Sequence, residues 1–387
     1  MNKTDIKRKS VLLSVAVVVA IAAVVIWYTA SWRPRALYEK ATAPDTEQAT
    51  AVDCFERLAK RSSRKWSGIG YWNLFLYYNE TNDPKSGEML EGAAANDFDK
   101  GRARLRLAQA CSGEAPVNGI KHDVARAISL LEEEATRSDY NPDYKYQAAC
   151  SLVEILLFEP GHQDYDKAEQ FVGRYFDGRF SQRWPLMRHY GGILQHMGRM
   201  DPQGLNIEHG YLRDAQSGMP AYYRGNMWMR QAIYGTERAE YCMREALQSY
   251  QQAMMSHSRY LDYELLGRRI DILNEYCSAH TEYNDRSSLY GSDQYYWNGA
   301  VKPGWTTFTN LNIFTYDGMV RGGYPHGIGV GVWERDKKLF CGTWKNGTMD
   351  RGIFVMKDGS IYTGVIDKKG NFVDGTFVTP KNKQTDF

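Results

Sequence analysis

The sequence of 387 residues predicts a multidomain α+β protein with a single transmembrane helix, an α-helical solenoid and an all-β sheet of hairpins. An uninterrupted apolar run opens the chain, helix-like segments recur through its middle, and glycine-rich units recur near its end. These three observations predict the following parts: a cytoplasmic tail at 1–10, a transmembrane helix at 11–30, helical repeats at 36–280, a connector that could contribute a cap strand at 281–315, and hairpins at 316–379.

The apolar run Val11–Tyr28 contains one hydroxyl group and no charge. At the helical rise it spans roughly 27 Å, which is close to the hydrocarbon thickness of a bilayer. Basic residues precede it, and the positive-inside bias then places the N-terminus in the cytoplasm and exports the rest. A cleaved signal peptide is the alternative, but its apolar core is usually about 7–15 residues. The sequence therefore predicts a single-pass inner-membrane protein whose bulk is periplasmic and whose membrane contact is Val11–Tyr28.

The middle of the chain repeats with a period near forty. Asp83, Asp123 and Asp164 stand 40 and 41 residues apart, each before an apolar helical pattern. An aspartate in that place can accept hydrogen bonds from the free N–H groups of the helix. A small residue follows four positions later and permits close helix packing: Gly87, Ala127 and Ala168. One helix pair cannot bury its apolar stripe, so we expect successive pairs to stack into a solenoid.

The segments "NGIKHDVARAISLLEEEA" and "YKYQAACSLVEILLF" carry a family resemblance. With the dipeptides Arg126-Ala127 and Lys167-Ala168, they resemble the SEL1-like branch of the tetratricopeptide family. The match covers roughly residues 36–180. This resemblance implies a protein-interaction scaffold without chemistry of its own.

The C-terminal part contains three aromatic-x-Gly units at spacings of 24 and 22: Tyr316–Gly318, Phe340–Gly342 and Tyr362–Gly364. A further glycine series follows them at Gly327, Gly352 and Gly375. The pair Asp358-Gly359 is a strong hairpin signal because both positions tolerate positive φ. We therefore expect short strands joined by tight turns, with the three aromatic rings forming a ladder on one face.

These three units resemble MORN repeats, whose pattern alternates aromatic residues and glycines in the same register. The match covers residues 316 to about 377. The second aromatic residue of the pattern is missing at Met319-Val320, and Ile366 stands in its place in the last unit. The resemblance implies protein assembly and contact with membranes or lipids.

The charge balance and the missing motifs argue against several function classes. With 48 basic and 46 acidic side chains, the chain has no net field that would attract nucleic acid. It lacks the common hydrolase, nucleotide-binding and zinc motifs. His189 and His196 lie seven apart without a third ligand, so we expect partly exposed helix histidines rather than a metal site. We therefore predict no catalytic residue, no metal and no cofactor.

The leading hypothesis is a non-enzymatic, membrane-anchored scaffold or adaptor that binds proteins in a cell-envelope process such as secretion, polysaccharide export or defence. Its glycine-rich sheet would provide a second contact with a partner or an edge for self-association. The first alternative is glycan or peptidoglycan binding through aromatic side chains. Candidate binding residues are Tyr71, Trp72, Tyr222, Tyr223, Trp228 and Trp344. The second alternative is an enzyme with an unrecognised site in 181–310.

Overall fold

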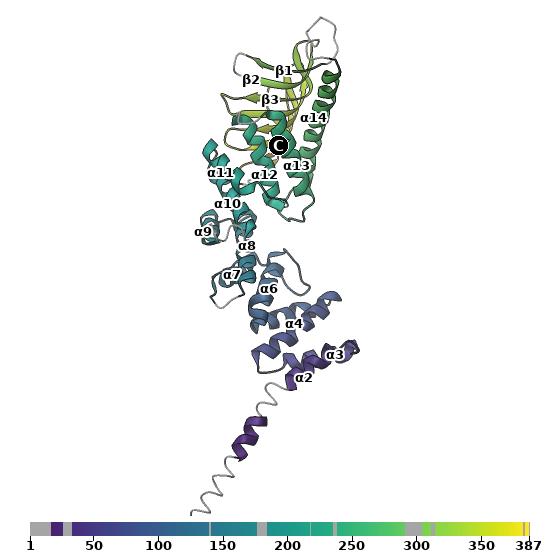
Figure 1. The fold of residues 1–387 in the computed structure, drawn as a ribbon, viewed down its shortest axis with the longest axis vertical. Helices are drawn as coiled ribbons and strands as arrows, with labels where there is room; N and C mark the ends of the chain where they lie inside the picture. Colours follow the sequence, from purple (N-terminus) through teal and green to yellow (C-terminus); the bar gives the residue numbers. More distant parts are fainter. Residues whose placement is uncertain are drawn as a thin grey trace, which may run out of the picture. The chain divides into compact units, whose positions relative to one another are not determined.

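The computed structural model describes residues 17–25, 33–138, 141–175, 184–216, 218–234, 238–290, 304–310, 314–381 and 384–386 (Figure 1). The chain divides into two compact units, Met1–Ile155 and Leu156–Phe387. The first unit is helical, and the second combines helices with a sheet. The compact units therefore divide the chain inside the predicted helical region rather than at its end near residue 280.

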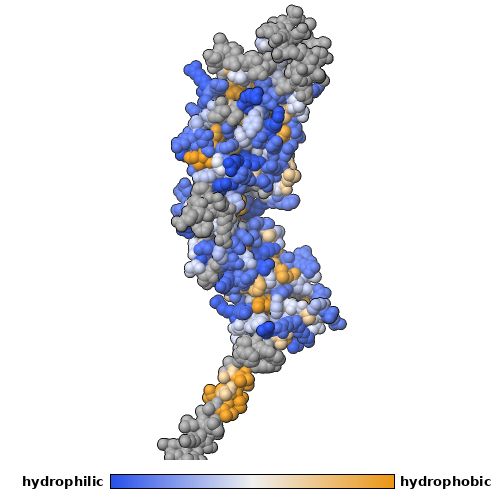
Figure 2. Space-filling model, viewed as in Figure 1, coloured by the Kyte–Doolittle hydropathy of each residue, from blue (hydrophilic) through white to orange (hydrophobic). Residues whose placement is uncertain are grey.

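The predicted transmembrane helix is not found. The described helix in this region covers residues 17–25, and the rest of the predicted span 11–30 lies outside the described residues. Its apolar side chains, such as Val18 and Ile21, are largely exposed (Figure 2). Within the described ranges no helix combines the length and apolar character that crossing a membrane requires. This finding contradicts the transmembrane part of the predicted fold class, the membrane contact through Val11–Tyr28 and the single-pass inner-membrane and periplasmic location.

The first unit is built from helices that pack on their neighbours in sequence. Their bounds are α2 (Arg33–Ala41), α3 (Gln48–Ala59), α4 (Arg64–Glu80), α5 (Lys85–Ala95), the 3₁₀ turn η2 (Phe98–Gly101), α6 (Arg102–Ser112), α7 (Val124–Thr136) and α8 (Pro142–Phe158). Because α2 contacts α3, α3 contacts α4, and so on to α7, the apolar stripes are buried by stacking rather than around one central core.

The predicted aspartate caps are confirmed at two helices. The Asp123 Oδ1 atom accepts a hydrogen bond from the Arg126 N–H at 2.9 Å, and α7 follows. At α9 (Tyr165–Tyr175), the Asp164 Oδ1 atom accepts one from the Lys167 N–H at 3.0 Å. The small residues behind these caps are packed as expected, since Ala127 and Ala168 are fully buried.

The second unit places its helices before an eight-stranded antiparallel meander, among the described residues. After α9 come α10 (Pro185–Gly198), α11 (Pro202–Leu212), α12 (Gly218–Gln231), η3 (Ala232–Tyr234), α13 (Ala239–Met254) and α14 (Tyr263–Tyr290). The strands are β1 (Gly304–Asn310), β2 (Phe314–Arg321), β3 (Tyr324–Trp333), β4 (Lys338–Lys345), β5 (Thr348–Val355), β6 (Ile361–Ile366), β7 (Phe372–Val378) and β8 (Gln384–Asp386). Helix α14 lies along the sheet and contacts β3 to β6 (Figure 1).

One face of the sheet consists of aromatic rings that lie on pairs of glycines. Each pair joins neighbouring strands: Gly318 with Gly329, Gly342 with Gly352, and Gly364 with Gly375. The covering side chains are those of Tyr316, Phe340 and Tyr362, all fully buried. A Cβ atom added to any of the six glycines would lie within 2.9 Å of its covering side chain. These glycines are needed because no side chain fits between the rings and the backbone.

Gly327, the first member of the further glycine series, has a different place in the sheet from Gly352 and Gly375. Gly318 pairs with Gly329, whereas Gly327 lies opposite Trp344. A β-bulge between Gly318 and Val320 shifts the register of this hairpin, and sequence spacing does not show the bulge.

We predict that Gly352→Ala destabilises the second unit by about 1–3 kcal/mol, the usual cost of overpacking a filled core. Its new methyl group would lie 2.4 Å from the Cys341 carbonyl oxygen and 2.7 Å from the Phe340 ring. Chemical denaturation followed by circular dichroism measures the change.

Gly210→Ala is the matched control, because this helical glycine of α11 is exposed and has open space around it. It should gain about 0.5–1 kcal/mol from the higher helix propensity of alanine. Equal effects of the two substitutions would contradict the close packing of ring on glycine.

Candidate functional site

The six aromatic residues proposed for binding are mostly interior. Five of them, Trp72, Tyr222, Tyr223, Trp228 and Trp344, are between 2% and 8% exposed. Tyr71 is half-buried, and its ring lies over Gly92 of α5, where an added Cβ would approach it to 2.5 Å. The exposed ring platform that glycan binding needs is therefore absent at five of these six positions.

Contacts with neighbouring side chains explain why these rings are buried. Trp72 stacks on Phe98 with ring centroids 5.0 Å apart, and the Arg102 guanidinium lies 5.0 Å from its ring. Trp344 packs edge-on against Tyr316 and Phe340 in the aromatic face of the sheet, and its Nε1–H donates to the Gly329 carbonyl oxygen at 3.2 Å. Tyr222 and Tyr223 pack edge-on against each other with ring centroids 5.6 Å apart, which is likewise a core contact.

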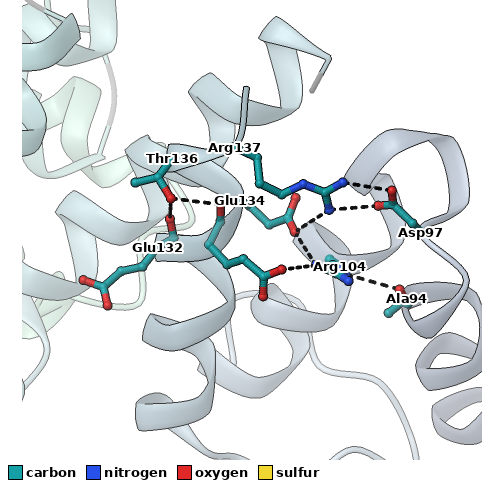
Figure 3. A network of polar contacts seen from close by, with 8 residues as sticks. Ala94, Asp97, Arg104, Glu132, Glu134, Thr136 and Arg137 are labelled. Atoms are coloured by element: carbon teal, nitrogen blue, oxygen red, sulfur yellow. Dashed lines mark hydrogen bonds and ion pairs between the residues drawn. The ribbon is translucent and has the colours of Figure 1, made fainter. Parts of the chain in front are cut away.

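A polar cluster in the first unit centres on Glu134, a fully buried residue of α7 (Figure 3). The Glu134 Oε1 atom lies 3.2 Å from Arg104 Nη1 and 3.8 Å from Arg137 Nη1. Its Oε2 atom is buried and has no hydrogen-bond partner within the described residues. Burial is the largest influence and raises the pKa of Glu134 to about 7, although Arg104 and Arg137 lower it.

The same cluster holds a strained turn. Asp97, Asp99 and Lys100 adopt left-handed φ values of 53°, 52° and 47°, which cost about 1–3 kcal/mol each for residues other than glycine. Arg137 donates to both carboxylate oxygens of Asp97 at 3.2 and 3.0 Å, and the Tyr144 hydroxyl donates to Asp99 at 3.0 Å. Helices α7 and α8 thus fix the turn between α5 and α6, which is a structural role.

A second buried cluster joins three helices of the second unit. His196 of α10 lies 3.0 Å from Glu208 Oε1 of α11, and Arg230 of α12 donates to Glu208 Oε2 at 2.8 Å. All three side chains are at most 2% exposed. Burial lowers the pKa of His196, so its ring is neutral at pH 7. The prediction of partly exposed helix histidines is therefore wrong: His189 and His196 are both buried.

Polar contacts also join α14 to the sheet. The fully buried Arg269 donates to Thr363 Oγ1 at 3.0 Å, to the Tyr222 hydroxyl at 3.0 Å and to Asn226 Oδ1 at 3.1 Å. Two helical turns beyond Arg269, the Tyr276 hydroxyl donates to Asp317 at 2.6 Å. Of these residues, sequence reasoning singled out only Tyr222, because the adjacent Arg268 and Arg269 look like a solvated helix face until the sheet is placed beside them.

Beside these contacts lies a groove of about 260 Å³ between α14 and strands β5 to β7. It is lined by Arg268, Asp271, Ile272, Glu275, Arg351, Thr363, Gly364, Val365 and Asp374. Its walls carry charges of both signs.

Among the described residues we find neither a group of side chains that could hold a metal ion nor a disulfide bond. There, no three or more His, Cys, Asp or Glu side chains are grouped so that they could hold a metal ion. All six cysteines are free thiols. Burial raises the pKa of Cys150 to about 12 and that of Cys277 to about 11, which keeps both protonated at neutral pH.

No family model matches the chain, and comparison with curated proteins and with solved structures likewise gives no match. The resemblances to SEL1-like and MORN repeats therefore stay predictions from sequence. Function must instead be inferred from the geometry of the two units.

We predict that Glu134 makes the first unit less stable as pH rises from about 4.5 to 7. Its folded pKa of about 7 lies above the unfolded value of 4.5, so the folded state binds the proton more tightly in this window. The loss is at most about 3 kcal/mol. Urea denaturation at pH 5 and pH 8, with hydrogen exchange of the α6 and α7 amides, measures it.

Glu134→Gln should remove most of this pH dependence. Glu133→Gln is the matched control, because Glu133 contacts the same Arg104 but its side chain is 57% exposed. A pH profile that Glu133→Gln flattens as much as Glu134→Gln would contradict the assignment.

For the second cluster, we predict that Glu208→Gln destabilises the second unit by about 3–5 kcal/mol, since it leaves the Arg230 charge buried without its carboxylate. The double variant Glu208→Gln/Arg230→Met should recover a large part of this loss. Denaturation of the two single variants and the double variant measures the coupling. Additive effects would argue against a buried ion pair.

Proposed function

We propose that the chain is a non-enzymatic scaffold or adaptor that binds a protein partner through the helical array of its first unit. The observation that carries this proposal is the stacking of α2 to α7 on sequence neighbours. Such an array has a large surface for its length, and helical arrays of this kind are common protein-binding surfaces. The sheet of the second unit would supply a further contact, including self-association.

One exposed surface of the array suits a protein partner. Leu76 of α4 is 47% exposed, one helical turn beyond Trp72 on the same side of the helix. Arg102 of α6 stacks on Trp72, and Arg106 lies 5.8 Å from the Phe75 ring. Stacking limits the conformations of a guanidinium and so lowers the entropy lost on binding. We call Leu76 and the exposed Arg102 the Leu76 surface, and it fits a segment with an apolar side chain beside a carboxylate.

Site-specific photocrosslinking tests this proposal in the full chain. A benzophenone side chain at position 76 should give a discrete adduct with a partner in cells, and the same probe at the exposed Lys60 is the control. Arg102→Glu should reduce the adduct about tenfold or more through like-charge repulsion, whereas Arg102→Lys should retain part of it. No adduct at position 76, or an identical adduct at position 60, would overturn the Leu76 surface. Crosslinks between two copies would identify self-association.

A further inference from the structure

The turn η2 and the residue before it are held in a strained backbone conformation. Asp97, Asp99 and Lys100 have left-handed φ values of 53°, 52° and 47°. Strain of this kind persists only where surrounding contacts hold it, and it is common in switch regions. Arg137 supplies the bidentate contact, because it donates to both carboxylate oxygens of Asp97. We therefore expect the turn to relax if Arg137 moves away from Asp97.

The Arg137 guanidinium lies between Asp97 and the buried Glu134 (Figure 3). Its Nη1 atom donates to Asp97 Oδ1 at 3.2 Å and lies 3.8 Å from Glu134 Oε1. The other arginine of the cluster, Arg104, is already closer to Glu134, at 3.2 Å, and lies 2.5 Å from Glu133. A negative charge on Glu134 therefore competes with Asp97 for Nη1 of Arg137.

The protonation of Glu134 decides the charge balance of this cluster. The charged side chains around it are Arg104 of α6, Glu133 of α7, Arg137 at the C-cap of α7 and Asp97 before η2. The nearest contribution of α5 is the neutral Ala94 carbonyl, which accepts from Arg104, and Lys145 of α8 donates to the Arg137 carbonyl. With Glu134 neutral, the two arginines balance the two carboxylates that they contact. With Glu134 ionised, one buried negative charge is left over, which is costly.

This change of charge falls near neutral pH. Burial raises the pKa of Glu134 from 4.5 to about 7, so the folded chain carries the neutral acid below pH 7 and the carboxylate above it. The Oε2 atom is buried and has no hydrogen-bond partner within the described residues. Once ionised, this oxygen gains from any donor that moves toward it.

The turn also contacts the Leu76 surface. Phe98 of η2 stacks on Trp72 with ring centroids 5.0 Å apart. Arg102, the first residue of α6 after the turn, lies 5.0 Å from the same ring. Relaxation of the turn would therefore change the positions of both Phe98 and Arg102 on Trp72.

We propose that Glu134 is a pH-sensitive switch for the Leu76 surface, acting through Arg137 and the turn η2. Neutral Glu134 leaves Arg137 on Asp97, and the turn is held. Ionised Glu134 draws Arg137 Nη1 away from Asp97, the turn relaxes, and the Arg102 guanidinium loses its fixed position. A partner then binds more tightly at pH 6 than at pH 8; this last step rests on the proposed function, whereas the opening of the turn does not.

Hydrogen–deuterium exchange of the full chain at pH 6 and pH 8 tests the conformational step. At each pH the wild type is compared with Glu134→Gln, which keeps the site neutral and cancels the intrinsic pH dependence of amide exchange. The amides of residues 97–101 should exchange about tenfold faster in the wild type at pH 8, one unit above the pKa of about 7, and equally at pH 6. Amides of α4 should show no such difference, because the opening is local.

Two further variants separate the switch from general effects of charge. Glu133→Gln is the matched control and should keep the pH dependence, since this exposed carboxylate contacts the same Arg104. Asp97→Asn should give fast exchange of the turn at both pH values. Asparagine tolerates the left-handed φ of this position but cannot form the bidentate ion pair with Arg137. Thermal melts verify that each variant folds.

The partner step is tested with the benzophenone probe at position 76 in cell lysate. The adduct should be at least about fivefold more abundant at pH 6 than at pH 8, the lower end of usual coupling between sites. Glu134→Gln should give equal adduct at both pH values.

Equal exchange of the turn in the wild type and Glu134→Gln at pH 8 would overturn the switch. So would equal acceleration of the α4 amides, which would indicate a general loss of stability. An adduct that does not change with pH would overturn the link to the Leu76 surface. If no adduct forms at all, the proposed function fails and its regulation with it, while the exchange data still decide the conformational step.

Discussion

The second unit depends on the contact between aromatic rings and paired glycines. Tyr316, Phe340 and Tyr362 lie on cross-strand glycine pairs, and the two tyrosine hydroxyls donate to backbone carbonyls three residues ahead, at Met319 and Val365. A ring in direct contact with two backbones buries its apolar surface without a second layer above it. One face of the sheet is thus largely filled by its own side chains, and the opposite face is left for the helices.

That opposite face explains why α14 is attached by polar contacts. Alternation along the strands places Asp317, Thr363 and Thr376 toward the helices, where they pair with Tyr276, Arg269 and Arg268. Buried hydrogen bonds of this kind add modestly to stability, but leaving one unmade is expensive. They therefore favour one register of α14 over its neighbours, because a shift of one helical turn would leave the Arg269 charge facing apolar strand residues such as Ile361 or Val365.

The sequence predicts best where local geometry decides. Asp123 and Asp164 are helix caps because a short carboxylate side chain reaches nearby N–H groups without help from distant residues. The alternation of aromatic residues and glycines predicts strands, but Gly327, Gly329 and Gly331 occupy equivalent alternate positions, and only the bulge in β2 selects Gly329 as the partner of Gly318. Glu134 follows Ala127 by seven residues and so shares its buried stripe, a signal within the run "EEE" that could have been noticed. The candidate aromatic residues could not be sorted in this way, because a ring that packs a core and a ring that binds a ligand have the same sequence pattern. The sequence also could not predict the contacts of Arg268 and Arg269, because their partners on the strands lie about a hundred residues further along the chain.

Two arginine edges attach α14 to the sheet, and each does so through a single threonine hydroxyl. Loss of the Thr363 bond would leave the Nε–H of the fully buried Arg269 without an acceptor on the sheet, which is costly for a buried charged group. The attachment of α14 therefore depends on the register of β6 and β7, because that register places Thr363 opposite Thr376 and presents both hydroxyls to the helix.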